Sequence, residues 1–196
     1  LFINTSAIGV IPSGIEIHAH QAQVGDKVLI NGFIGDHGAA IVDARGEMAL
    51  QNDIQSDCQP LYHLIKQMLQ TCPTIHCLRD ATRGGIATVL NEFAAASQCH
   101  IQLQENALPV KPQVRGMCEL LGLDPLYLAN EGKVVCLVAA DQAEAVLQTM
   151  QKHPAGIHSA IIGEVIQGPA RVSLKTTFGA HRLVDRLVGE QLPRIC

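Results

Sequence analysis

The chain has 196 residues, of which 47% are hydrophobic, enough to build one or two apolar cores. Only 16% of the residues are charged and the formal net charge is −4, which excludes the broad basic surface of a nucleic-acid-binding protein and a polybasic membrane-binding stretch. The longest wholly apolar run, residues 134–140, is far shorter than the roughly 20 residues that span a bilayer.

The seven cysteines are scattered singly, and none of their spacings is the Cys-x-x-Cys of a zinc ribbon or a thioredoxin-type site. No signal sequence opens the chain, so we expect a cytoplasmic protein with reduced thiols, most of them in the core. The nine histidines, among them His18, His20 and His76, lack the spacing of three or four metal ligands. We therefore expect no metal site among them.

The first residues, "LFINTSAIG", lack an initiating methionine and read as a strand (residues 2–5) that is already under way. Pro12, Gly14 and the two histidines that follow are typical of a linker, and we place a domain boundary near residue 22. This start predicts that the chain is a piece of a longer protein.

Alternating and helical apolar spacings predict an ordered series of strands and helices. In chain order they are a strand at Lys27–Ile30, a helix at 57–70, a strand at 74–80, a helix at 83–97, a strand at 100–104, a helix at 112–121, a strand at 133–140, a helix at 141–152 and a final strand pair at 160–166 and 171–176. Asp57 and Asp141 are predicted to cap their helices, and Gly122 to end the third helix. Because strands and helices alternate through one domain, we expect an α/β fold with helices packed on a sheet.

The motif "IGDHG" (residues 34–38) follows the first of these strands. Gly35 and Gly38 allow a close approach of the backbone, while Asp36 and His37 offer titratable groups for a phosphate or a substrate. The alternative is a turn that only caps a helix.

The motif "RDATRGG" (residues 79–85) enters a predicted helix, whose free N–H groups and dipole attract an anion. Arg83 has a guanidinium suited to bidentate phosphate contact, Gly84 and Gly85 are the paired glycines of the helix start, and Asp80 is placed to cap the helix or orient Arg83. The alternative is a capped helix packed tightly on a strand.

The motif "NEGK" (residues 130–133) precedes the most apolar strand. There Asn130 is a candidate binding residue, and Glu131 is a candidate general base, because a carboxylate at the lip of a buried strand can be desolvated. The ordinary alternative is a salt bridge between Glu131 and Lys133 in a solvent-facing turn.

The final residue, Cys196, is a further candidate site residue. A thiol is a nucleophile only as its thiolate, which Arg194 would favour, and Pro193 would stiffen the chain just before it. The alternative is an incidental terminal residue.

Taken together, these motifs, the stretches "ALPVKPQVRGMCELLGLDPLYLANEGK" and "IGEV" and the terminal "PRIC" resemble the HypE family of hydrogenase maturation factors, in the same order and from Leu1 to Cys196. That family belongs to the superfamily of ATP-using enzymes named after PurM, aminoimidazole ribonucleotide (AIR) synthetase. The resemblance implies a PurM-like C-terminal α/β domain at residues 22–185, with a mixed sheet covered by helices. Residues 1–21 would be the last strand and exit linker of an N-terminal ATP-binding domain that lies mostly upstream, and residues 186–196 a flexible tail.

The resemblance also implies a reaction. Cys196 would receive a carbamoyl group from a HypF-like carbamoyltransferase, and ATP-dependent dehydration, with Mg²⁺ held mostly by the upstream domain, would turn the thiocarbamate into a thiocyanate. The cyano group would then pass to iron on the HypC–HypD complex, as a ligand of a NiFe hydrogenase. Glu131 would be the base, the full-length protein a homodimer, and the present chain alone inactive.

Two other functions remain open from the sequence. Another PurM-like ATP-dependent enzyme, such as a small-molecule kinase or ligase, would have no need of the terminal "PRIC". A docking module would bind partners and present Cys196 without ATPase activity.

Overall fold

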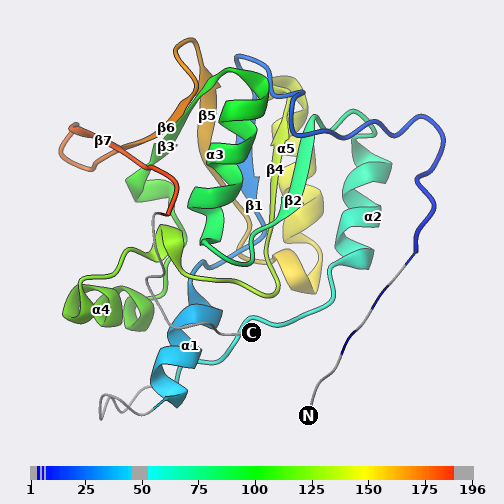
Figure 1. Ribbon diagram of the computed structural model, residues 1–196. Helices are drawn as coiled ribbons and strands as arrows, with labels where there is room; N and C mark the ends of the chain where they lie inside the picture. Colours follow the sequence, from blue (N-terminus) through cyan, green and yellow to red (C-terminus); the bar gives the residue numbers. More distant parts are fainter. Residues whose placement is uncertain (1–3, 5, 7, 46–52, 188–196) are drawn as a thin grey trace.

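One seven-stranded sheet runs through the molecule in the computed structural model, which describes residues 4, 6, 8–45 and 53–187 (Figure 1). The strand order is β2-β4-β1-β5-β3-β6-β7, and the neighbours are antiparallel except for the parallel pair of β3 and β6. The strands are β1 (Lys27–Ile30), β2 (Cys77–Asp80), β3 (His100–Gln104), β4 (Val134–Val138), β5 (Ala160–Ile166), β6 (Arg171–Lys175) and β7 (His181–Leu183). This mixed sheet with helices confirms the predicted fold class.

Helices cover both faces of the sheet. One face packs against α3, and the opposite face packs against α2 and α5 (Figure 1). The helices of the described residues are α1 (Asp36–Ala44), α2 (Tyr62–Thr71), α3 (Gly85–Ser97), α4 (Pro112–Leu121) and α5 (Ala140–Gln151), with short 3-10 turns η1 (Glu105–Ala107), η2 (Pro125–Tyr127) and η3 (Pro154–Gly156). None of these helices is long and apolar enough to cross a membrane.

Strand β4 is buried along its whole length, as its apolar sequence predicts. Because successive side chains of a strand point to opposite faces, Val135 and Leu137 join the core under α3. Val134, Cys136 and Val138 join the core under α2 and α5. The segment just before β4, which includes "NEGK", is therefore anchored to the most buried strand of the molecule.

A third, smaller core joins α1 and α4 at one end of the sheet (Figure 1). Ala39 of α1 and Val114 of α4 both belong to it, together with Leu128 from the segment that leads to β4. Pro112 stands at the start of α4, and Gly122, with φ of 66°, ends it, as predicted. This core brings the start of α1 next to the loop before β4.

Neither of the two aspartates predicted as helix caps occupies the N-cap position of its helix. Helix α2 begins only at Tyr62 and its N-cap is Leu61, so the prediction that Asp57 caps it is wrong. The N-cap of α5 is Ala139, and Asp141 lies inside the first turn. Asp141 still interacts favourably with the helix dipole there.

One prediction about strands is wrong, and one strand was missed. β5 and β6 do not pair with each other, because β3 lies between them. β7 was not predicted. Outside the sheet, the rings of His18 and His20 stack 5.1 Å apart. The strand predicted at 2–5 lies outside the described residues except for Asn4.

Candidate functional site

The side chain of Asn130 joins the three glycine-containing motifs at one end of the sheet. Its Oδ1 accepts a hydrogen bond from the N–H of Gly35 at 2.9 Å, and its Nδ2 donates to the carbonyl oxygen of Ala81 at 2.9 Å. The N–H of Gly38 donates to the carbonyl oxygen of Ala129 at 3.0 Å. Because Asn130 is only 1% exposed, its bonds are shielded from water and hard to replace. Segments that the sequence treats separately thus form one site.

Asp57 holds the backbone on either side of Glu131. Its Oδ1 accepts from the N–H of Glu131 at 3.0 Å, and its Oδ2 accepts from the N–H of Gly132 at 3.3 Å. The same Oδ2 lies 2.9 Å from Nζ of Lys133, and the side chains of Asp57 and Lys133 are only 3% and 5% exposed. Lys133 therefore pairs with Asp57 inside the protein, and the alternative of a solvent-facing salt bridge between Glu131 and Lys133 is wrong.

Glu131 presents its carboxylate outward from this fixed backbone, with a side chain that is 38% exposed. The position of Glu131 before a buried strand predicts a desolvated carboxylate, whereas the structure shows an accessible one. His37, in the first turn of α1, places Nε2 3.9 Å from Oε1 of Glu131. The other ring nitrogen of His37, Nδ1, lies 2.8 Å from Oγ of Ser56. Glu131, His37 and Ser56 therefore form a row of three polar side chains.

Sequence reasoning missed both Ser56 and Asp57 as site residues. Asp57 stands just before apolar residues at helical spacing, so its local signal is that of a helix cap. Its contact with Glu131 spans 74 positions of the chain. No local pattern encodes such a contact, and only the packing of the loop after α1 against β4 creates it.

Asp36 lies within the same cluster and is 5% exposed. Its Oδ2 is 2.7 Å from Nζ of Lys111, which precedes α4, while its buried Oδ1 has no hydrogen-bond partner among the described residues. Burial raises the pKa of Asp36, and the ammonium of Lys111 opposes this rise only in part. Asp36 thus ties α1 to α4 beside the site.

The paired glycines at the start of α3 have a packing reason. Gly84 and Gly85 have φ of 74° and 60°, in the left-handed region that favours glycine. A Cβ on Gly85 would overlap the carbonyl oxygen of Leu126 and lie 2.7 Å from that of Leu128. The start of α3 is therefore packed tightly, but against η2 and the segment after it, and not against a strand as the alternative had it.

Asp80 and Arg83 are both exposed beside this helix end. Asp80 ends β2 opposite Val134, close to "NEGK". The N-cap of α3 is Gly84, without a side-chain hydrogen bond, so Asp80 does not cap the helix. Arg83 is an exposed residue next to a helix N-terminus, an arrangement that fits a phosphate group at the surface.

Five of the six described cysteines are buried, as predicted, and only Cys58 is exposed. Burial raises the pKa of Cys77 and of Cys136 to about 12 and that of Cys118 to about 11, so these thiols stay protonated and unreactive near neutral pH. Cys196 lies outside the described residues. Within the described part of the chain, no group of three or more His, Cys, Asp or Glu side chains could hold a metal ion.

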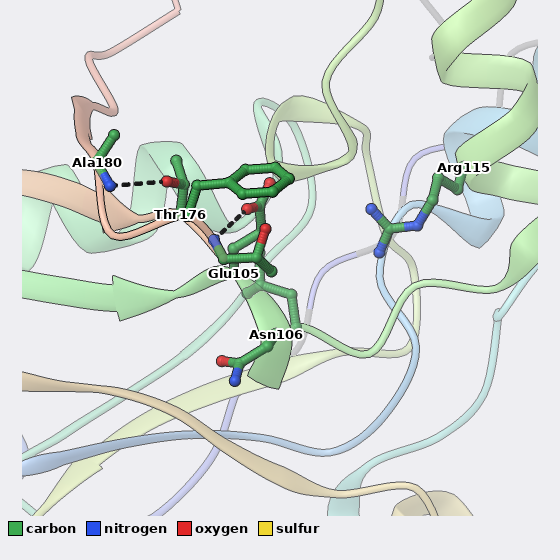
Figure 2. Close-up of a pocket in the computed structure, with 8 residues that line it drawn as sticks. Glu105, Asn106, Arg115, Thr176 and Ala180 are labelled. Carbon is green, nitrogen blue, oxygen red and sulfur yellow. Dashed lines mark hydrogen bonds between the residues drawn. The ribbon is translucent and has the colours of Figure 1, made fainter.

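A separate pocket of about 590 Å³ lies between η1, α4 and the turn after β6 (Figure 2). Arg115 points into it from α4, and Glu105 closes it by accepting a hydrogen bond from the N–H of Thr177 at 2.8 Å. None of the predicted site residues that the structure describes lines this pocket. The candidate site at Asn130 lies elsewhere, where the segments around Gly35, Ala81 and Asn130 meet.

The sequence of residues 23–175 matches the model of the family described as AIR synthase related protein, C-terminal domain. The chain belongs to this family. This AIR synthase related chain is 48% identical to the carbamoyl dehydratase HypE of Rhodobacter capsulatus and 49% identical to that of Azotobacter vinelandii, each time over 100% of the chain and 58% of the relative. It therefore spans somewhat more than half the length of these relatives.

The solved structures that resemble this chain also include HypE proteins. Escherichia coli HypE matches with a TM-score of 0.90 and 48% identity, over 96% of this chain and 58% of the other. A HypE–HypF complex matches with a TM-score of 0.85 and 44% identity, over 89% and 57% of the two chains. A HypE in complex with ATP matches with a TM-score of 0.85 and 43% identity, over 91% and 55%. The predicted resemblance to HypE is confirmed.

Proposed function

We propose that this chain serves hydrogenase maturation as part of an ATP-dependent carbamoyl dehydratase, in which Glu131 acts on a carbamoyl group carried by Cys196. The observation that carries the proposal is the junction at Asn130, where three motifs meet beside an accessible carboxylate whose backbone is fixed by Asp57. The high identity to proteins named carbamoyl dehydratase HypE supports the same function.

The reaction explains why a base is needed. An amide oxygen is a poor leaving group, so the carbamoyl oxygen first attacks the γ-phosphorus of ATP, which forms a C–O–P linkage and releases ADP. The nitrogen then loses its protons, the C–O bond breaks with its electron pair on phosphate, and a C≡N bond forms. Carbamoyl-sulfur and ATP thus give cyano-sulfur, ADP, phosphate and a proton. We assign the removal of a proton from that nitrogen to the exposed carboxylate of Glu131.

The side chains around Glu131 would divide the remaining work. Arg83 is accessible and fits a contact with a transferring phosphate or with the phosphorylated intermediate. Asp80 and the start of α3, with Gly84 and Gly85, would lie beside that phosphate. Asn130, Asp36 and His37 would shape the surface on which the tail docks. Most of the site for ATP and Mg²⁺ would belong to an N-terminal domain upstream of these residues.

The partners follow from the same proposal. A HypF-like carbamoyltransferase would load Cys196, in keeping with the HypE–HypF complex among the similar structures. The HypC–HypD complex would receive the cyano group, and the full-length protein would be a homodimer. Neither a nucleic acid nor a membrane would be involved, and the protein would act in the cytoplasm.

A second candidate is a carrier module that presents Cys196 but has no ATPase activity. The exposed carboxylate of Glu131 favours the enzyme, since a carrier needs no accessible base. A different PurM-like kinase or ligase would leave the terminal cysteine without a role.

Mass spectrometry of the C-terminal peptide tests the proposal. In the full-length protein, incubation with the carbamoyltransferase should add a carbamoyl group to Cys196, and ATP should then remove one water from the adduct. Cys196→Ala should form neither adduct, because the acceptor sulfur is missing, while Cys58→Ala, which removes an exposed cysteine elsewhere, should form both. A wild-type adduct that never loses water with ATP would support the carrier module instead.

A further inference from the structure

We propose that His37 is a proton relay that acts through Glu131: it takes up the first proton that Glu131 removes from the carbamoyl nitrogen, so that the same carboxylate can remove the second. The inference rests on the proposed dehydration and adds a role for His37. Its basis is the row of Glu131, His37 and Ser56 described above.

The stoichiometry of the reaction creates the need for a relay. Two N–H protons leave the same nitrogen: one when the carbamoyl oxygen is phosphorylated, and one when phosphate departs. A carboxylate holds one proton at a time. Glu131 must therefore lose the first proton before it can accept the second. No redox step is involved, and of the two protons one ends on hydrogen phosphate and one in solvent.

The geometry places His37 where that proton would go. Nε2 of His37 is 3.9 Å from Oε1 of Glu131, while the Glu131 side chain is 38% exposed and the His37 side chain 14% exposed. The more exposed carboxylate can close this gap by rotating, and contacts of this kind often tighten only when substrate is bound. When Nδ1–H of His37 donates to Oγ of Ser56, Nε2 carries a lone pair that faces Glu131 and can accept its proton.

The neighbouring residues hold the ring of His37 and the backbone of Glu131 in place. Ser56 and Asp57 are consecutive, so one loop orients His37 through Oγ of Ser56 and anchors the backbone of Glu131 through the carboxylate of Asp57. The N–H of Cys58 also donates to Oγ of Ser56, at 3.3 Å. In the part of the chain that the structure describes, two ion pairs lie next to the row, Asp57 with Lys133 and Asp36 with Lys111. Since each pair is internally compensated, neither competes with Glu131 for His37.

Single-turnover dehydration in the full-length protein, started by ATP after carbamoylation of Cys196, tests the relay. His37→Ala should load the carbamoyl group normally and convert it to the cyano group more slowly, by roughly 10²-fold, the lower end of what a positioned proton-transfer group contributes. Added imidazole should restore much of the rate, because it can enter the space that the ring leaves and accept the proton. Ser56→Ala should slow conversion less, and Ser56→Thr, which keeps the hydroxyl, should restore it.

The control variant is His63→Ala, which removes an exposed histidine on α2, and it should convert at the wild-type rate without any effect of imidazole. Normal carbamoyl loading of His37→Ala shows that this variant is folded; if it fails to load, His37→Gln is used in its place. Wild-type conversion by the His37 variant would overturn the relay and leave the dehydratase intact. Slow conversion that imidazole does not rescue would also overturn it, and would make His37 a structural residue. A wild-type protein that never forms the cyano adduct would overturn the dehydratase itself.

Discussion

Buried polar side chains, more than apolar packing, determine where Glu131 stands. Asn31 donates to the carbonyl oxygens of Gly132 at 3.0 Å and Ala155 at 2.8 Å, and its Oδ1 accepts from the N–H of Val134 at 2.8 Å. With Asn130 and Asp57, it satisfies the backbone on both sides of Glu131. Because each of these side chains is buried, replacing one leaves a polar group unpaired and costs about 1–3 kcal/mol. Function and stability are therefore coupled at this site.

Asp36 makes the free energy of unfolding depend on pH, and the direction of its effect follows from the shift of its pKa. Burial raises the pKa of Asp36 in the folded protein above its ordinary value of 3.8, so the folded state keeps a proton that the unfolded chain has already lost. The contribution of this group to the free energy of unfolding is therefore present below pH 3.8 and is lost as the pH rises through the raised pKa. Urea unfolding at several pH values should show this loss in the wild type and its absence in Asp36→Asn. If Asp36→Asn, relative to the control Asp53→Asn at an exposed position, leaves the pH dependence unchanged, Asp36 is not the group responsible.

At the scale of elements, α3 is seated by a contact that only glycine permits. Gly85→Ala would force a Cβ into the carbonyl oxygens of Leu126 and Leu128 and hold a residue with a side chain at φ of 60°. The left-handed conformation costs about 1–2 kcal/mol and the overpacking about 1–3 kcal/mol, so we expect a loss of roughly 2–5 kcal/mol in the free energy of unfolding. Chemical denaturation measures it. Gly116→Ala, in α4 with no atom within 4 Å of its Cβ, should instead be neutral or stabilising, and an equal effect of the two changes would refute the packing argument.

The sequence predicts most elements because their signals are local. Apolar spacing locates α3 and β4, and Pro112 and Gly122 delimit α4. Strand neighbours are different, because the order along a sheet depends on contacts between distant segments, so the parallel pairing of β3 with β6 could not be read from periodicity. β7 has three exposed residues and no alternation to detect. The same limit applies to the site: Asn130 and Glu131 stand in a visible motif, whereas Ser56 and Asp57 join it only through the fold.

At the scale of the whole molecule, the described sheet and helices enclose three apolar cores, but the chain spans only 58% of the Rhodobacter capsulatus relative. The function proposed above assigns most of the ATP and Mg²⁺ site to an N-terminal domain upstream of these residues. We therefore expect the 196-residue chain to be folded and to bind ATP negligibly, whereas a longer protein that includes the upstream domain should bind it with Mg²⁺. Isothermal titration calorimetry measures the ATP affinity of both proteins. Micromolar, Mg²⁺-dependent ATP binding to the shorter chain would contradict the assignment of the ATP site to the upstream domain.

The proposed reaction requires Glu131 to remove protons from a carbamoyl group on Cys196. Glu131→Gln keeps the size of the side chain and leaves the backbone bonds to Asp57 in place, so carbamoyl loading should be normal in the full-length protein. Mass spectrometry of the C-terminal peptide after addition of ATP should then show the carbamoyl adduct accumulating, with its loss of water slowed by about 10²–10⁴-fold, as expected for a missing general base. Glu144→Gln, an exposed change on α5, should convert like the wild type. Conversion of the carbamoyl adduct to the cyano adduct by Glu131→Gln at the wild-type rate would contradict the claim.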